Sequence, residues 1–263
     1  MINRRFEAKW FNTIWSSLKQ VGKEAGNMVE RLGPEEAQRR LTTEFINTGI
    51  SAEVSNLWKD VGLFHANRQY RELVREEKKA LGFSAQWTAK ILEVLRMFLI
   101  EKVLFAASET TKKMLLKVIG EGIEQGWGID KIVDELENFD GLRYQAARIV
   151  RTEVNRAANL GKKTGAESFP YEQNKIWIAT HDFRTRGNNP DDHADHLRMD
   201  GQTVPLDAKF IDPRNGEGLD FPGDPEAPPS ETVNCRCTQG FVGQRDERGR
   251  LIPKQTQMIS MRT

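Results

Sequence analysis

The stretch LRYQAARIVRTEVNRAANLGKKTGAESFPYEQNKIWIAT, residues 142–180, decides the fold, because the pattern of the chain changes within it. Its first part carries apolar residues at helical spacing, with Val150 and Val154 on one face. After Pro170 this period ends, and residues 175–180 have the branched and aromatic content of a β-strand. We therefore predict a long helix that leads directly into a module with strands.

The residues before this stretch predict more helix. They are rich in Glu, Lys, Arg, Leu and Ala and contain few prolines. Leu92, Leu95, Leu99 and Val103 recur at steps of three and four, which is typical of the buried side of a helix. The segment Gly126-Trp127-Gly128 predicts the end of one helix and the start of another, because glycine readily adopts the left-handed conformation that terminates helices.

The C-terminal part is rich in proline, glycine and aspartate, which predicts long loops at residues 212–218 and 221–229. Further short strands are expected at residues 202–205 and 239–242, and a polar C-terminal tail at residues 246–263. The predicted fold class is α+β. It combines a mainly α-helical N-terminal half with a small, loop-rich, short-stranded C-terminal module that contains the cysteines and most histidines.

The charge and hydropathy of the chain exclude several classes of protein. Its 39 basic and 38 acidic residues leave a formal net charge of +1, so no global field attracts a polyanion, and any DNA contact must be local. No apolar run is long enough to span a membrane, and the first residues lack the apolar stretch of a secretory signal. We expect a protein that is made in a cytoplasm and has no membrane partner.

Three of the four histidines and both cysteines occur in the C-terminal part. Two residues separate His193 from His196, and one residue separates Cys235 from Cys237, a spacing that suits metal ligation or free thiols better than a disulfide. The two pairs could close the loops around a structural Zn²⁺ ion with His196, Cys235, Cys237 and His193 as ligands. The alternative is a pair of buried thiols beside ordinary surface histidines.

A catalytic metal is a third alternative for this region. His196 and Asp200, with nearby Asp182, Asp191, Asp192 and Asp195, could bind a divalent cation that activates water for phosphodiester cleavage. The stretch has no defined nuclease signature, however. The chain also lacks a Gly-x-Ser-x-Gly elbow and a phosphate-binding glycine loop, so no catalytic residue is assigned.

Arg184 and Arg186 flank an expected turn and have two interpretations. Guanidinium groups at such a turn are candidate DNA contacts, because they bind phosphate in bidentate geometry. They could equally pair with carboxylates inside the protein, and the many nearby acidic residues favour this second interpretation.

Residues 142–242 resemble the phage Mu F-type minor head proteins, also called phage head morphogenesis proteins. The resemblance depends on several short motifs that occur in one order with suitable loop lengths. These motifs are ARIVRTE (147–153) with NRAAN (155–159), KIWIAT (175–180) with Asp182 and RTR (184–186), HLRMDGQ (196–202), FPGDP (221–225) and NCRC (234–237).

The resemblance implies a minor structural protein of the virion that is made in the bacterial host cytoplasm. It would be present in multiple copies in the head interior or at the portal vertex. The resemblance implies a role in head morphogenesis, with portal protein as partner and major capsid or scaffolding protein and phage double-stranded DNA as further candidates. It also suggests a role in DNA packaging or ejection. Residues 1–140 are then the helical region that associates with portal or capsid, and residues 141–245 are the signature domain.

In this interpretation the signature residues are structural. Arg151 and Glu153 on the long helix could pair with Asp182 and Arg184 and so hold the module against the helical half, a role in which buried charge pairs set geometry more than stability. A metal-dependent nuclease and a DNA-binding adaptor for the phage genome remain alternatives to a non-enzymatic head protein.

Overall fold

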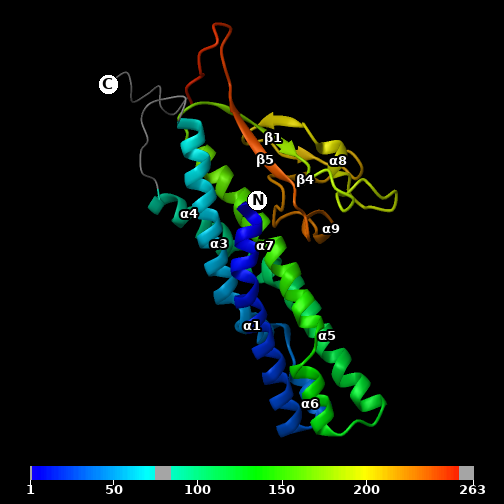
Figure 1. The fold of residues 1–263 in the computed structure, drawn as a ribbon. Helices are drawn as coiled ribbons and strands as arrows, with labels where there is room; N and C mark the ends of the chain where they lie inside the picture. Colours follow the sequence, from blue (N-terminus) through cyan, green and yellow to red (C-terminus); the bar gives the residue numbers. More distant parts are fainter. Residues whose placement is uncertain (1, 75–83, 255–263) are drawn as a thin grey trace. The chain divides into compact units, whose positions relative to one another are not determined.

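The computed structural model describes residues 2–74 and 84–254 and shows long helices followed by a module with short strands (Figure 1). The predicted α+β class is therefore confirmed. The helices, including the π-helical segment η1, are α1 (Ile2–Leu32), α2 (Pro34–Arg40), α3 (Thr43–Val74), α4 (Ser84–Phe98), η1 (Leu99–Leu104), α5 (Phe105–Glu124), α6 (Ile129–Glu137), α7 (Gly141–Glu167), α8 (His196–Met199) and α9 (Pro229–Thr232). The strands are β1 (Gln173–Ile178), β2 (Thr203–Pro205), β3 (Phe210–Ile211), β4 (Gly218–Leu219) and β5 (Thr238–Gly243).

The expected element boundaries agree closely with the structure where the pattern was strong. Helix α5 ends at Glu124, and Gly126 has a φ of 65°, as the predicted glycine termination requires. The strands expected at residues 175–180, 202–205 and 239–242 correspond to β1, β2 and β5.

The chain divides into two compact units, each made of two segments. The first unit contains residues 1–57 and 95–153, and the second contains residues 58–94 and 154–263. Helices α3 and α7 each contribute residues to both units. The sequence suggested a different division, into residues 1–140, 141–245 and 246–263. This division into domains stays a prediction.

The first unit is a helical bundle with an apolar core. Helix α1 buries an unbroken row of apolar side chains, and α6 buries Ile132 and Leu136. A Cβ atom at Gly22 would lie only 2.8 Å from the carbonyl oxygen of Leu136, so the absence of a side chain allows α1 and α6 to approach closely. The buried side chains of α1 are Ile14, Leu18, Val21, Ala25 and Val29.

In the second unit, the end of α3 packs directly against the C-terminal half of α7. A Cβ atom at Gly161 would lie 2.2 Å from the carbonyl oxygen of Gly62, and one at Gly165 would lie 2.3 Å from that of Ala66. The two glycines lie one turn apart on α7, so they form a groove that admits the backbone of α3.

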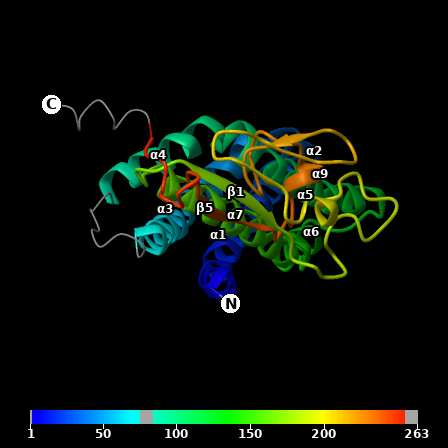
Figure 2. The ribbon, with the colours of Figure 1, turned by 90° about the horizontal axis from the view of Figure 1, so that it is seen from above.

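The strands form two small sheets in the second unit. β1 is the central strand of a three-stranded antiparallel sheet with the order β2-β1-β5, and β3 pairs with β4 in a separate hairpin. Figure 2 shows β1 and β5 side by side, next to α7. The core of the module gathers around Trp177, Met199, Phe210 and Leu219, and both cysteines belong to it.

The described part of the predicted polar tail, up to Lys254, packs on the module through backbone contacts. Arg245 forms an antiparallel bridge with Leu251, and the N–H of Lys254 donates to the carbonyl of Pro170 at 3.0 Å. Residues 255–263 lie outside the described part of the chain. Within residues 2–74 and 84–254, no helix has the length and apolar character needed to cross a bilayer.

A buried histidine and cysteine cluster as the candidate functional site

His196, Cys235 and Cys237 come together in the core of the module. The Nδ1 atom of His196 lies 3.7 Å from the Sγ atom of each cysteine, and all three side chains are at most 3% exposed. Both cysteines are free, as their spacing predicted. A tetrahedral zinc ion bonded at about 2.3 Å to sulfur and about 2.0 Å to nitrogen would separate nitrogen from sulfur by about 3.5 Å. The observed distances fit such an ion.

The other ring nitrogen of His196 is held by Glu231. Nε2 lies 3.0 Å from Oε2 of Glu231, and the other oxygen of this carboxylate accepts a hydrogen bond from Nδ2 of Asn215 at 2.6 Å. A carboxylate on the far nitrogen fixes the ring and leaves Nδ1 to face the two sulfurs, which is the arrangement that metal-binding histidines commonly show. Glu231 and Asn215 could not be predicted from the sequence, because each is distant from His196 along the chain and neither belongs to a spacing motif.

The electrostatics of the cluster favour a positive charge between the two sulfurs. Burial opposes protonation of His196, but Cys235 and Glu231 outweigh it and raise the pKa of the imidazole to about 9. Hydrogen bonding from Cys237 and the nearby imidazolium lower the pKa of Cys235, whereas the neighbouring Cys235 raises that of Cys237. Thiolate and carboxylate groups on either side of the imidazole would also attract a metal cation.

The structure places His193 outside this group. Its side chain is exposed, whereas that of His196 is buried three residues later. Helix α8 begins only at His196, so the two histidines do not share a helical face despite their spacing. His181 is also separate from the cluster, because it is exposed and its Nε2 lies 2.7 Å from Oδ2 of Asp200.

A second group of potential ligands shares His196. His196, Asp212 and Glu231 are buried and have ligand atoms close together. Asp212 accepts hydrogen bonds from the N–H groups of Asp195 and Arg214, at 2.7 Å each, so its carboxylate already holds two loop segments. The cysteine-containing group therefore offers the better metal site, since thiolates and imidazole suit zinc.

The aspartates considered for a catalytic metal have structural roles. Oδ1 of Asp200 accepts the N–H of Ala179 at 2.8 Å, and Asp195 caps α8 through the N–H of Arg198. Oδ2 of Asp192 accepts the N–H groups of Gly187 and Asn189. These residues stabilise turns of the loop between β1 and α8. Asp191 is exposed.

Asp182 forms an ion pair, but its partner was not predicted. Both carboxylate oxygens bind Arg236, the residue between the two cysteines, and this guanidinium lowers the pKa of Asp182 to about 2. Arg184 contributes its backbone N–H, which donates to Oδ1 of Asp182 at 2.9 Å. Arg151 and Glu153 belong to the first unit, and their pairing with Asp182 and Arg184 stays a prediction.

The two arginines proposed as DNA contacts differ in their surroundings. Arg184 is exposed and lies over the ring of Phe183, which is 85% exposed. Arg186 donates to the carbonyl of Val233 at 2.7 Å, so it anchors the segment that leads to the cysteines. A DNA contact by either residue stays a prediction.

Helix α7 holds the loops that carry the cluster. Nδ2 of Asn159 donates to the carbonyls of Pro222 and Cys237, at 3.0 and 3.1 Å, and its Oδ1 accepts the hydroxyl of Thr238. Nε of Arg156 donates to the carbonyl of Gly223 at 2.8 Å. Asn159 and Arg156 thus connect two segments, at residues 222–223 and 237–238, to one helix.

Comparison with known proteins agrees with this architecture. Residues 113–240 match the family described as "Phage Mu protein F like protein", which confirms over just under half of the chain the resemblance that the motifs indicated. A relative in Bacillus subtilis (strain 168), described as "Uncharacterized protein YqbB", is 25% identical over 162 residues. This alignment covers 60% of the present chain and 47% of the relative, so the chain spans about half of that protein's length. No solved structure matches.

Proposed function

We propose that this chain is a minor structural protein of a tailed-phage head that acts in head morphogenesis, because residues 113–240 match the phage Mu F-like family. We propose the portal as its main partner, with major capsid or scaffolding protein and phage DNA as further contacts. The protein would be present in multiple copies, in the head interior or at the portal vertex, and would assist DNA packaging or ejection. The family match is the observation that carries this proposal.

The module would be held together by a structural Zn²⁺ ion. His196, Cys235 and Cys237 would be three of its ligands, and Glu231 would orient the imidazole. The donor set fits the metal, because two thiolates and one imidazole nitrogen within bonding reach of a single point suit zinc. A bound ion would anchor loops that contain little regular secondary structure, which is the usual role of such sites in small modules.

Burial of the cluster favours a structural role over the nuclease alternative. The ligand side chains are almost fully covered by the module, so a DNA phosphate could reach them only if the module opened. A hydrolytic metal site needs an open coordination position that substrate can approach. The aspartates that could have served such a site are engaged in turns and caps.

Elemental mass spectrometry on the purified protein tests the zinc proposal. We expect one zinc ion per chain in the wild type and loss of zinc, together with a lower melting temperature, in Cys235→Ser and His196→Ala. The exposed His181→Ala serves as a matched control and should retain the metal. His193→Ala tests the fourth ligand predicted from sequence, and retained zinc in this variant would exclude His193. Absence of metal from the wild type would reject the proposal.

Assembly of particles tests the proposed function. The gene for this chain is deleted from a plasmid that expresses the head proteins of its phage, and the particles are purified and analysed by mass spectrometry and electron microscopy. We expect the protein in particles only when portal is also expressed, and aberrant or unfilled heads in its absence. Its absence from wild-type particles would reject a structural role. Retention by DNA cellulose at low salt would support the adaptor alternative.

A further inference from the structure

Strand β5 lies at the edge of its sheet. Its partner among the described residues is β1, and the order β2-β1-β5 leaves its other side without a neighbouring strand. Edge strands present unpaired backbone groups to which another chain can add, and proteins commonly protect or use them. What can bind at the free edge of β5 therefore depends on the backbone groups and side chains that lie along it.

The register shows which groups point away from β1. The backbone N–H and C=O of Trp177 pair with Gln202 and Gly201, toward β2, at 2.9 Å each. Its neighbours in β1 therefore turn their backbone groups toward β5, where Ile176 lies opposite Gly240. It follows that Gln239, Phe241 and Gly243, the alternate residues of β5, point their N–H and C=O groups outward.

These outward groups are largely unpaired. The carbonyl of Gln239 lies 3.5 Å from Nζ of Lys162, which agrees with its outward direction. Among residues 2–74 and 84–254, the backbone N–H and C=O groups of Phe241 and Gly243 that point outward have no hydrogen-bond partner. Two residues with free donors and acceptors, two positions apart, match the repeat of an antiparallel strand.

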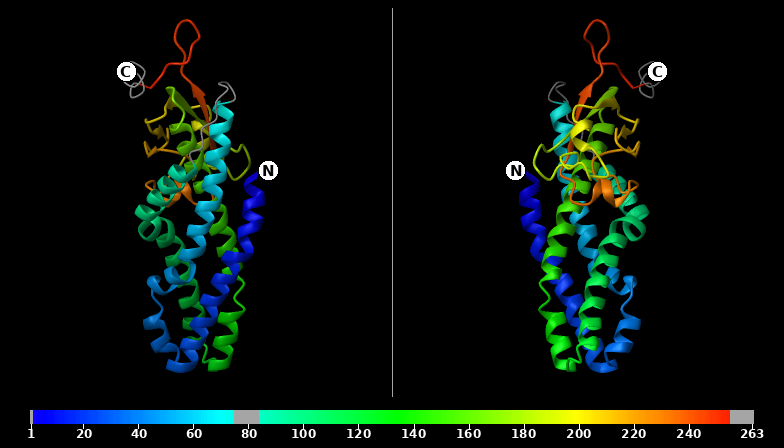
Figure 3. Two further views of the ribbon diagram at one scale, coloured as in Figure 1. Left: turned by 90° about the vertical axis from the view of Figure 1, so that its left-hand side faces the viewer. Right: turned by 90° about the vertical axis from the view of Figure 1, so that its right-hand side faces the viewer.

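A pocket of about 480 Å³ lies along α3, and a second one, of about 330 Å³, lies at this edge. The second pocket is bounded by β5, by Lys162 of α7 and by Gln69 and Glu72 near the end of α3. Figure 3 shows this end of α3 and β5 side by side. The pocket is therefore formed entirely by residues of the second unit.

Two buried carboxamides in this pocket have unmet hydrogen-bonding capacity. Gln69 is 93% buried, and its carboxamide makes no hydrogen bond to another described residue. Nε2 of Gln239 donates to the carbonyl of Asn159 at 2.8 Å, whereas its buried Oε1 has no partner in the described part of the chain. Of the two, only Oε1 of Gln239 is a fully buried unpaired atom, whereas the carboxamide of Gln69 lines the pocket and is open to a polar ligand.

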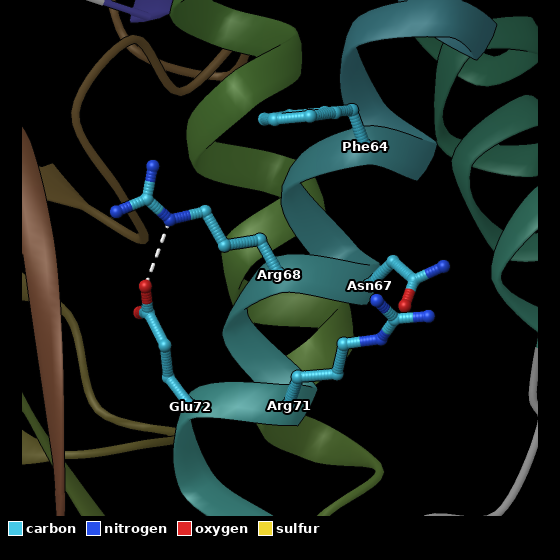
Figure 4. Close-up of a pocket in the computed structure, with 5 residues that line it drawn as sticks. All are labelled: Phe64, Asn67, Arg68, Arg71 and Glu72. Atoms are coloured by element: carbon cyan, nitrogen blue, oxygen red, sulfur yellow. Dashed lines mark hydrogen bonds and ion pairs between the residues drawn. The ribbon is translucent and has the colours of Figure 1, made fainter.

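The charge in the pocket favours an acidic ligand. The ammonium of Lys162 donates to the hydroxyl of Thr238 at 2.6 Å and approaches one carbonyl, but its hydrogen-bond partners include no carboxylate. The nearby Glu72 pairs instead with Nε of Arg68 at 2.8 Å (Figure 4). Burial lowers the pKa of Lys162 to about 8, and the attraction of the Glu72 carboxylate offsets this effect only in part.

We propose that the outer edge of β5 binds an extended segment of a partner protein as an added antiparallel or parallel strand, with an acidic side chain of that segment next to Lys162. The free backbone groups of Phe241 and Gly243 would pair with the added strand, and the carboxamide of Gln69 would bind one of its amide groups. A second copy of β5 is a poorer occupant, because pairing edge to edge would bring a second lysine rather than an anion. The inference depends on this geometry and not on the proposed role in the phage head.

Peptide binding to the full-length protein tests this proposal. The probes are labelled peptides of about seven residues with a central Asp among Thr, Val and Ile, and a matched pool with Asn at the centre. We expect acidic peptides to bind with a Kd below about 1 mM and the Asn pool to bind at least about tenfold more weakly. If neither pool binds at peptide concentrations up to about 1 mM, the proposal is overturned. Equal binding of both pools would overturn it as well.

Backbone methylation of the best peptide distinguishes an added strand from other binding modes. Only alternate residues of an added strand face β5, so N-methylation of one alternate set should abolish binding and methylation of the other set should preserve it. On the protein, Phe241→Pro removes an outward N–H, whereas Phe241→Ala removes the same ring and keeps the N–H. We expect the proline variant alone to lose binding of every peptide.

Two lysine variants test the charge. Lys162→Met should weaken binding of the acidic peptide at least about tenfold and leave binding of the Asn peptide unchanged. Lys117→Met, at an exposed position on α5 that does not line the pocket, should change the binding of neither peptide.

If Phe241→Pro does not fold, the two methylated peptides still decide whether the peptide binds as an added strand. Equal effects of the two methylation sets would overturn strand addition. A dimer that forms without peptide and is lost in Phe241→Pro would replace the partner segment by a second copy.

Discussion

Nε2 of His196 lies 3.0 Å from Oε2 of Glu231, and both side chains are almost fully buried. This contact joins α8 to α9 and turns the opposite ring nitrogen toward Cys235 and Cys237. A buried carboxylate is costly unless it is paired, so its position indicates that the orientation of the imidazole matters to the module.

Removal of the orienting carboxylate should weaken the proposed zinc site. In Glu231→Ala the imidazole loses its partner on Nε2, and we expect zinc affinity to fall about 10- to 100-fold. Competition with a chromophoric chelator measures this affinity. Glu226→Ala, which removes an exposed carboxylate from a neighbouring loop, is the control and should leave affinity unchanged. Unchanged affinity in Glu231→Ala would show that Glu231 does not support a metal ligand.

Loss of the Asn159 side chain should destabilise the second unit. Asn159→Ala leaves the carbonyls of Pro222 and Cys237 without this donor in a buried environment, and we expect a loss of about 2–4 kcal/mol in the free energy of unfolding. Urea denaturation followed by tryptophan fluorescence measures the change. Asn67→Ala, at an exposed position of α3, should cost less than about 0.5 kcal/mol.

The close approach of α3 and α7 predicts a steric effect. In Gly161→Ala the new methyl group would lie 2.2 Å from a backbone oxygen of Gly62, so we expect a destabilisation of at least about 2 kcal/mol. Gly120→Ala is the matched control, because its methyl group would meet only the amide nitrogen of Gln38 at 3.5 Å. Helix propensity then predicts a neutral effect or a gain of up to about 1 kcal/mol. A similar effect of both substitutions on melting temperature would contradict the packing argument.

His65 should make stability depend on pH below neutrality. Burial, helped by the positive charges of Lys162 and Arg68, lowers the pKa of His65 from 6.5 to about 3. Between these values the unfolded chain binds a proton that the folded chain does not, so the free energy of unfolding decreases as pH falls. From pH 7 to pH 5 the loss should be about 2 kcal/mol.

Denaturant titrations at these two pH values test the assignment. His65→Leu should remove this contribution of about 2 kcal/mol between pH 7 and pH 5. The opposite dependence from His196, whose pKa is raised, is present in both proteins, so the difference between the two slopes reports His65. The exposed His193→Leu should keep the wild-type slope. An unchanged slope in His65→Leu would show that His65 binds protons equally in the folded and the unfolded chain.

The amino-acid sequence by itself determined the elements and the chemistry available to them. Helical periodicity, the glycines at 126 and 128 and the composition change after Pro170 were enough to predict the helices and three strands, because these signals depend on neighbours along the chain. The spacing of the two cysteines excluded a disulfide and indicated a metal or free thiols. The order of the motifs indicated the resemblance to phage Mu F-type proteins, and the family match over residues 113–240 supports it.

Only the tertiary structure decided which of these residues meet. It selected His196 over His193, because α8 begins between them and the core closes over one side chain only. It supplied Glu231 and Asn215 as the support of that histidine, gave Asp182 the partner Arg236, and left one edge of β5 open. Such contacts join residues far apart in the sequence, so they depend on how the loops pack on α7 and leave no local pattern from which they could be predicted.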